Sequence, residues 1–182
     1  MKHPGLSVNH VGVSVPDIRA AITWYGHVFG FRCIMGPRVL RAGAAATAET
    51  SSIFGPDYRS AYQAHLLTAN GVGIELFQFV EPEVGPRESD LGWRRRGPWH
   101  ICLTVPDLDA QLQRVLDFGG VQVCPVMRFV PGREWALVYT RDPWGTVIEL
   151  MSHSYAEVFS NWPQPGALER TEWMPGGRLD GG

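Results

Sequence analysis

The chain contains the same short phrase twice, and this internal repeat limits the possible folds more than any other feature of the sequence. Residues 9–20 read NHVGVSVPDIRA and residues 99–110 read WHICLTVPDLDA. Each phrase has a histidine, a run of small and apolar residues, and then Val-Pro-Asp. Such self-similarity indicates duplicated structural units. In a chain of 182 residues it predicts two related modules within one globular unit.

A helix is expected directly after each Val-Pro-Asp. Asp17 can cap the first helix and Gly30 can end it, while Asp107 can cap the second, which ends at 119–120. Apolar residues recur at helical spacing in both segments. The two stripes are Ile18, Ala21, Ile22, Tyr25 and Phe29 in the first helix, and Leu108, Leu112, Val115 and Leu116 in the second.

Each half closes on a second shared phrase, GVGIELFQF in the first and GTVIELMSH in the second. Further strand-like runs are YQAHLLTA, VQVCPVM and WALVYTR. Each half therefore reads as a strand, a helix and about three strands, which predicts an α+β fold of two tandem βαβββ modules. Their strands are expected to form a curved mixed sheet around a cleft. The predicted divisions are a first module at 1–80, a linker at 81–97, a second module at 98–155 and a C-terminal extension at 156–182.

Two segments fall outside the repeat. Residues 36–60 are rich in small residues and are expected to form an unusually long connection, a feature that is often functional in a compact fold. The tail after residue 154, with Trp162 and Trp173, is expected to wrap the surface and to be disordered at its end.

Composition and charge give no reason to expect a nucleic-acid or membrane partner. The formal net charge is −2, and no apolar run approaches the roughly 18 residues of a membrane span. Arg94, Arg95 and Arg96 are interpreted as a solvated face of the linker. Three cysteines without CxxC spacing, and a start without a signal peptide, favour reduced thiols in a cytoplasmic protein. A small-molecule substrate is the expected partner.

The histidines and two glutamates lie on matching faces of the predicted strands. His10 and His100 each open a strand, on the face opposite the valines and isoleucines that suit packing under a helix. Glu75 and Glu149 each sit inside an Ile-Glu-Leu phrase of a closing strand. A carboxylate in an apolar strand costs several kcal/mol unless it is paired or bound to a cation.

Two explanations of these residues stand side by side. Each His–Glu pair could be a buried hydrogen-bonded pair that stabilises its own module. Alternatively, both pairs converge on a divalent metal, since imidazole and carboxylate groups suit zinc, nickel, cobalt, manganese or iron. The repetition of the pair in both halves favours the metal site. No thiolate belongs to the set, which argues against a closed structural zinc site.

These phrases resemble the vicinal oxygen chelate superfamily, also called the glyoxalase/bleomycin-resistance/dioxygenase group. The resemblance covers roughly residues 6–155 and implies paired βαβββ modules around a metal-holding cleft. By position it implies four metal ligands, His10, Glu75, His100 and Glu149. This ligand pattern is most similar to bacterial lactoylglutathione lyases. Methylmalonyl-CoA epimerases are also similar, but they typically have glutamine at the position of Glu75.

The resemblance implies an isomerase, epimerase or lyase that moves a proton on a small α-oxygenated carbonyl compound through a metal-stabilised enediolate. Glu149 is the expected base, with Glu75 the second candidate. His65 and Gln63 share a strand face and could line the cleft, with His65 as a possible second base or substrate contact.

Two other functions remain open. Ring-cleaving dioxygenases of the superfamily use iron, with two His and one Glu, so a dioxygenase is an alternative. Bleomycin-binding relatives lack the metal ligands, and a ligand-sequestering resistance protein is the third possibility. A homodimer is expected, and the two modules could face each other within one chain or across two chains.

Overall fold

The computed structural model describes residues 5–44, 50–86 and 91–160. These residues run through the order strand, helix and strands twice, which confirms the predicted α+β class. The first half contains β1 (His10–Ser14), α1 (Ile18–Phe29), β2 (Arg32–Arg41), α2 (Thr50–Phe54), β3 (Ser60–Leu67) and β4 (Gly73–Glu81). The second half contains β5 (Ile101–Thr104), α3 (Leu108–Asp117), β6 (Val121–Gln122), β7 (Met127–Arg128), β8 (Ala136–Arg141), β9 (Val147–Met151) and α4 (Tyr155–Ser160).

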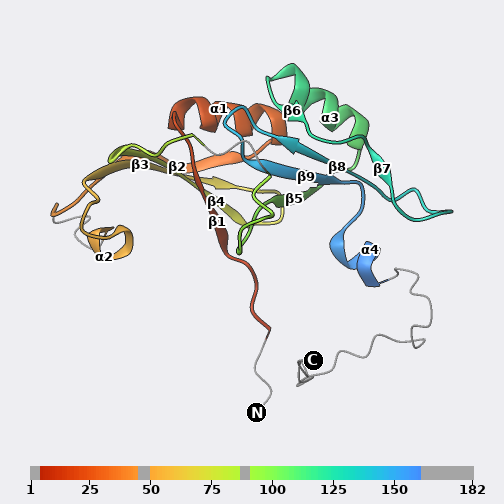
Figure 1. Ribbon diagram of the computed structural model, residues 1–182, viewed down its shortest axis with the longest axis horizontal. Helices are drawn as coiled ribbons and strands as arrows, with labels where there is room; N and C mark the ends of the chain where they lie inside the picture. Colours follow the sequence, from red (N-terminus) through yellow and green to blue (C-terminus); the bar gives the residue numbers. More distant parts are fainter. Residues whose placement is uncertain (1–4, 45–49, 87–90, 161–182) are drawn as a thin grey trace, which may run out of the picture.

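The strands form two sheets of matching topology. The first sheet has the order β1-β4-β3-β2, and the second has the order β5-β9-β8-β6, with β7 also pairing with β8. β1 is parallel to β4 and β5 is parallel to β9, while the other pairs are antiparallel. This agrees with the predicted pair of βαβββ modules: within the described residues each half forms one mixed sheet, and the two sheets lie side by side. They build an arch, with α1 and α3 over its convex side (Figure 1).

Both long helices begin where the repeated Val-Pro-Asp predicts. The side chain of Asp17 accepts hydrogen bonds from the backbone N–H groups of Arg19 and Ala20, and α1 ends at Gly30 with φ 69°. Asp107 accepts from the N–H of Ala110 at the start of α3. A left-handed residue at a helix end favours glycine, because a Cβ would meet the following carbonyl.

The core lies between the helices and the sheets and is shared by the two halves. Val13 and Val15 of the first half and Val105 of the second are buried in one apolar cluster, as the predicted strand faces require. The halves are also joined by hydrogen bonds. The indole N–H of Trp24 donates to the Phe118 carbonyl at 2.9 Å. Because this core is continuous, each half supports the other's helix.

Several local predictions were wrong. β2 extends to Arg41 and so takes in the first part of the connection expected at 36–60, because Gly36-Pro37 is accommodated at an irregularity in strand pairing between Met35 and Arg38. The strand expected at 121–127 is broken into β6 and β7, and Pro125, which lacks an N–H group, lies between them. Leu116 is 37% exposed and does not belong to the buried stripe of α3.

The segment after residue 154 begins with α4, which the sequence did not predict. Trp162, Trp173 and the rest of the predicted surface-wrapping tail lie outside the described residues. Among the described helices, none combines the length and apolar character needed to cross a bilayer.

Candidate functional site

The register of the first sheet brings three predicted residues to one face. Gly12 of β1 lies opposite Glu75 of β4, and His65 of β3 lies opposite the same glutamate. His10 is two residues before Gly12 and so projects from the same side. The sheet therefore places a histidine on each flank of Glu75.

Glu75 has close contacts through both carboxylate oxygens. Its Oε2 is 3.4 Å from Nε2 of His10. Its Oε1 is 3.7 Å from Nε2 of His65 and accepts a hydrogen bond from the side-chain amide of Gln63. Gln63 in turn accepts a 2.8 Å hydrogen bond from Nε of Arg38. The predicted pair is thus one part of a larger polar network.

The second sheet repeats the arrangement with different neighbours. Glu149 of β9 lies opposite Cys102 of β5 and Tyr139 of β8. Nε2 of His100, one residue before β5, is 3.0 Å from Oε2 of Glu149. Glu149 is only 6% exposed, although its strand is otherwise apolar. Tyr139 therefore occupies in this half the place that His65 occupies in the first.

Burial and the charge of Glu149 keep its two acidic neighbours protonated. Burial is the larger cause, and the adjacent carboxylate adds to it; together they raise the pKa of Tyr139 to about 12. The same two causes, in the same order, raise the pKa of the Cys102 thiol to about 12. At neutral pH both groups are neutral hydrogen-bond donors and neither competes with Glu149 as a base.

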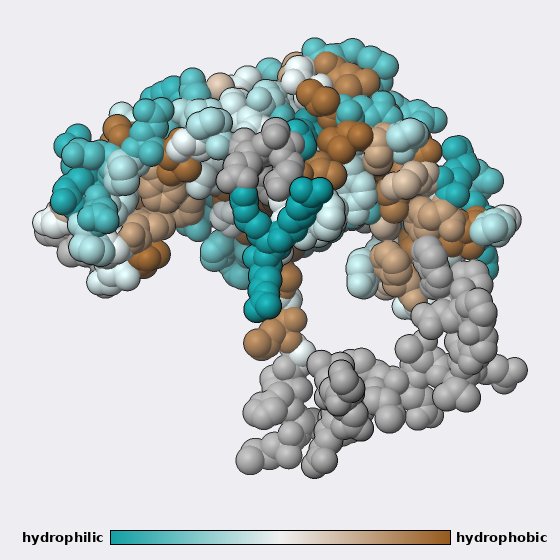
Figure 2. Space-filling model, in the orientation of Figure 1, coloured by the Kyte–Doolittle hydropathy of each residue, from teal (hydrophilic) through white to brown (hydrophobic). Residues whose placement is uncertain are grey.

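Aromatic rings line both pairs. Trp99 stacks on Tyr139 with a centroid distance of 5.2 Å, and the His100 ring meets Tyr139 edge-on at 5.5 Å. In the first half, Phe77 and Phe79 share the strand face of Glu75 and pack with Phe54 of α2. Figure 2 shows apolar residues gathered at the lower ends of the arch, near α2 and α4.

The donor atoms of each pair fit one divalent cation. Two ligand atoms at about 2.1 Å from an ion lie roughly 3.0–3.4 Å apart for octahedral or tetrahedral angles. The observed His–Glu separations are 3.0 Å in the second half and 3.4 Å in the first. In the described part of the chain, Nδ1 of His100 and Nε2 of His65 are buried without a hydrogen-bond partner. Imidazole and carboxylate groups with spare capacity are suitable ligands for a transition metal.

The structure brings the predicted ligands together as two pairs and not as a cluster of four. Across residues 5–44, 50–86 and 91–160, no group of three or more His, Cys, Asp or Glu side chains is placed to hold one ion. The ligand role of His10, Glu75, His100 and Glu149 therefore stays a prediction.

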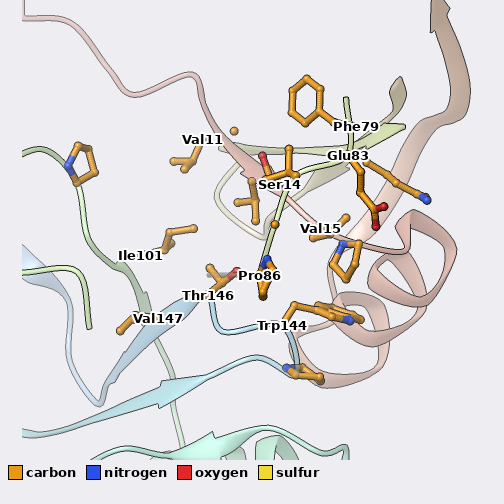
Figure 3. A pocket seen from close by; sticks show the side chains of 18 of the residues that line it. Val11, Ser14, Val15, Phe79, Glu83, Pro86, Ile101, Trp144, Thr146 and Val147 are labelled. Carbon is orange, nitrogen blue, oxygen red and sulfur yellow. The ribbon is translucent and has the colours of Figure 1, made fainter. Parts of the chain in front are cut away.

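An open cavity of about 920 Å³ lies between the two halves and reaches His100. Its wall combines β1, the segment that follows β4, the start of β5 and the β8–β9 turn, with Val11, Glu83, Ile101 and Trp144 facing it from several sides (Figure 3). Sites for small molecules in proteins have volumes of about 300–1,000 Å³ and a mainly apolar lining. The cavity is therefore large enough for a small ligand beside the second pair.

Sequence reasoning missed several neighbours of the glutamates. Arg38, Tyr139 and Cys102 were not predicted to be neighbours of the glutamates. Strand alternation could have placed Tyr139 and Cys102 on the correct face, but the pairing register that sets them opposite Glu149 comes only from the structure. Arg38 had no signal, because β2 was not predicted.

Two further described histidines make contacts outside the pairs. Nδ1 of His153 is 2.7 Å from Oγ of Ser152 beyond the end of β9. His27 lies near the C-terminal end of α1, beside the Phe118 ring. His3 lies outside the described residues.

Comparison with protein families matches residues 7–150 to the Glyoxalase/Bleomycin resistance protein/Dioxygenase superfamily. The chain belongs to this superfamily. The match includes all four predicted ligands and both copies of the repeat. It confirms the resemblance that the repeated phrases predict.

One curated member of the superfamily with a similar sequence is a 2-epi-5-epi-valiolone epimerase from an Actinomyces species. It is 28% identical over 158 residues, which cover 82% of this chain and 81% of the epimerase. The alignment therefore spans most of both proteins.

Solved structures of the superfamily share the fold. A glyoxalase family protein from Bacillus cereus matches with a TM-score of 0.65 and 20% identity, over 82% of this chain and 95% of that protein. The fosfomycin resistance protein FosX from Listeria monocytogenes, solved with Mn(II) and 1S,2S-dihydroxypropylphosphonic acid, matches with a TM-score of 0.53 and 16% identity, over 83% and 95% of the chains. Members of this fold thus include a protein that binds a divalent metal ion.

Proposed function

We propose that this chain is a metal-dependent isomerase of the glyoxalase I type, with epimerisation as its most plausible reaction. It would act on a small α-oxygenated carbonyl compound by moving a proton on the carbon next to the carbonyl. The observation that carries the proposal is the nearly buried Glu149, 3.0 Å from His100, in an arrangement that the first half repeats with Glu75 and His10. Buried carboxylates of this kind call for a cation or a reacting proton.

The four residues His10, Glu75, His100 and Glu149 would hold the ion, which is nickel, zinc, cobalt, manganese or iron. When bound, the ion supplies Lewis-acid stabilisation of negative charge on the substrate oxygens. The chemistry of the donors supports these ions over calcium or magnesium, since two imidazoles belong to the set.

The residues of this chain would provide the proton transfer itself. Glu149 is the proposed base, because its neighbours Tyr139 and Cys102 stay protonated and do not compete with it for a proton. Inverting a stereocentre requires a proton to leave one face of a carbon and return on the other. Glu75 is the second candidate base, and His65 beside it is a possible second base or substrate contact.

The similarity to an enzyme named as an epimerase supports this class of reaction. The cavity that reaches His100 is large enough for a small molecule and supports a small-molecule substrate.

The proposal includes a homodimer. The two His–Glu pairs of one chain lie apart, whereas a two-fold axis could bring the first pair of one chain against the second pair of another.

A cytoplasmic location is also proposed, and the free state of Cys33, Cys102 and Cys124 is consistent with it.

The decisive experiment is elemental analysis of natively purified protein, followed by solvent exchange in D2O with α-hydroxy ketones. We expect about one transition-metal ion per chain. We also expect deuterium to be incorporated at the carbon next to the carbonyl. Chelation should abolish the exchange and metal addition should restore it. Iron together with substrate-dependent oxygen uptake would instead favour a dioxygenase. Tight ligand binding by protein that remains metal-free and inert would favour a sequestering protein.

A further inference from the structure

Gln63 is a polar side chain inside the first sheet, and its amide joins an arginine to a predicted metal ligand. Gln63 is 6% exposed. Its Oε1 accepts from Nε of Arg38 at 2.8 Å, and its Nε2 donates to Oε1 of Glu75. A buried amide that has partners at both ends is held in one position.

The arginine determines which way the amide points. A guanidinium group only donates hydrogen bonds, so the atom of Gln63 that faces Arg38 must be the oxygen. The NH2 group must then face Glu75, and a flipped amide would turn two donors toward each other. Arg38 thus fixes Gln63 as a donor to the carboxylate.

The consequence for Glu75 is that its two oxygens have different roles. Oε1 receives the Gln63 hydrogen bond, while Oε2 is directed at the His10 ring, 3.4 Å away. Gln63 holds Oε1 from one side, so Oε2, which is directed at His10, is the oxygen better placed for an ion between the two side chains. The donated hydrogen bond also fixes the side-chain torsions, which lowers the entropic cost of binding.

The second half has no equivalent of this network. Gln63 lies opposite Phe77, two residues after Glu75. In the second half, the residue two positions after Glu149 is Met151, and Leu137 lies opposite it. The neighbours of Glu149 are instead His100, Tyr139 and Cys102. The two glutamates of the repeat therefore have different neighbours: an amide lies beside Glu75, and a phenol and a thiol lie opposite Glu149.

We propose that Arg38 and Gln63 are positioning residues that hold Glu75 as a one-oxygen metal ligand, and that this division of roles leaves the proton transfer to Glu149. The inference rests on the proposed metal-dependent function and adds a specific role for two residues outside the predicted ligand set. Both residues would act through Glu75, to which Gln63 is bonded directly and Arg38 through Gln63.

The test is Co2+ binding to the full chain, measured by calorimetry and by the visible absorption of bound cobalt. Gln63→Leu introduces the residue that the second half carries, and Gln63→Met keeps the length of the side chain without its donor. Both should weaken Co2+ binding by about 10–100-fold, as loss of a supporting hydrogen bond to a ligand does. Both should also change the cobalt spectrum. Arg38→Met, which releases the amide to flip, should give a smaller loss in the same direction.

Gln113→Leu is the matched control. Gln113 is exposed on α3, and its side-chain amide donates a hydrogen bond to Asp117 of the same helix. It should bind Co2+ like the wild type. Metal-free melting temperatures of all variants separate a folding defect from a positioning effect, and the Met variant maintains packing if the Leu variant fails to fold.

Variants of the predicted ligands distinguish failure of the positioning role from failure of the metal site. If His10→Gln and Glu75→Gln weaken Co2+ binding but both Gln63 variants stay within about twofold of the wild type, the positioning role is wrong and the metal site stands. If His10→Gln and Glu75→Gln leave Co2+ affinity unchanged, the proposed function fails and the positioning role fails with it.

Discussion

Glu149 and Glu75 occupy equivalent strands but have different surroundings. Glu149 lies beside a stacked Trp99–Tyr139 pair and the Cys102 thiol, while Glu75 is bonded to Gln63. A general base must be ionised and free to take a proton, whereas a ligand only needs a fixed oxygen. The surroundings therefore favour Glu149 as the base.

This difference predicts unequal effects of two matched substitutions. Glu149→Gln should lower kcat at saturating metal by roughly 10²–10⁴-fold, the usual contribution of a general base. Glu75→Gln should act mainly on the affinity for the ion and preserve more of kcat once metal is in excess, because an amide oxygen can still serve as a ligand. Steady-state kinetics across metal concentrations check both. Equal losses of kcat would contradict the assignment.

Asp142 is a second informative residue, because it is a carboxylate buried at the junction of the halves. It is 2% exposed and accepts hydrogen bonds from the Tyr25 hydroxyl and from the backbone N–H groups of Trp144 and Thr146. Burial outweighs these hydrogen bonds and raises the pKa of Asp142 above the ordinary value for Asp. Its charge therefore opposes folding at neutral pH.

The sign of the resulting pH dependence follows from proton linkage. Above the ordinary Asp pKa of about 3.9, the folded state binds more protons at Asp142 than the unfolded chain does. The contribution of this residue to the free energy of unfolding therefore falls as pH rises through that range. Asp142→Asn preserves the acceptor for the two N–H groups and removes the charge. Urea unfolding from pH 4 to pH 8 should show the wild type losing stability relative to this variant, and parallel curves would disprove the effect.

At the scale of elements, the duplicated helix caps allow a direct comparison between the halves. Asp17 accepts two backbone hydrogen bonds and Asp107 accepts one. Asp17→Ala and Asp107→Ala should each lower the free energy of unfolding by about 1 kcal/mol, with the larger loss at Asp17. Asp109→Ala, a change of an acidic residue in the first turn of α3, should cost only about 0.3–0.5 kcal/mol. Urea denaturation measures all three, and a larger loss at position 109 would contradict the capping argument.

The helices and the His–Glu pairs could be predicted from the sequence because their signals are local. Asp17, Gly30 and Asp107 act within one turn of helix, and the alternation around Glu75 and Glu149 sets their strand face directly. β2 was hidden because Gly36-Pro37 is typical of a turn, and only its pairing with β3 makes the segment a strand. Contacts across strands depend on register, which no local pattern encodes.

The same distinction holds inside the candidate site. His10 with Glu75 and His100 with Glu149 were predicted as partners, because each half repeats the phrase that contains them. The network from Arg38 to Glu75 joins three strands, so it became visible only once the sheet was assembled. Sequence repetition identified what the halves share, and the structure identified how they differ.

At the scale of the whole molecule, α1 and α3 join the halves on the convex side of the arch. Gln111 of α3 donates to the Val28 carbonyl of α1, and Tyr25 of α1 donates to Asp142 beyond β8. With the helices in contact, the two His–Glu pairs of one chain are held in separate sheets. A closed dimer with an isologous interface would create two equivalent composite sites.

This assembly predicts complementation between two inactive variants. His10→Gln disables the first pair and His100→Gln disables the second, so each variant alone should lose metal binding and activity. In a mixed dimer one composite site carries both substitutions, and the other combines the intact second pair of one chain with the intact first pair of the other. After unfolding and refolding of an equal mixture, about a quarter of wild-type sites should return, because half of the dimers are mixed and each has one intact site.

Metal content and solvent exchange measure the recovery, and sedimentation measures the dimer. Sites formed within single chains would give no recovery at any mixing ratio, whereas recovery that follows the fraction of mixed dimers requires two chains to share each site.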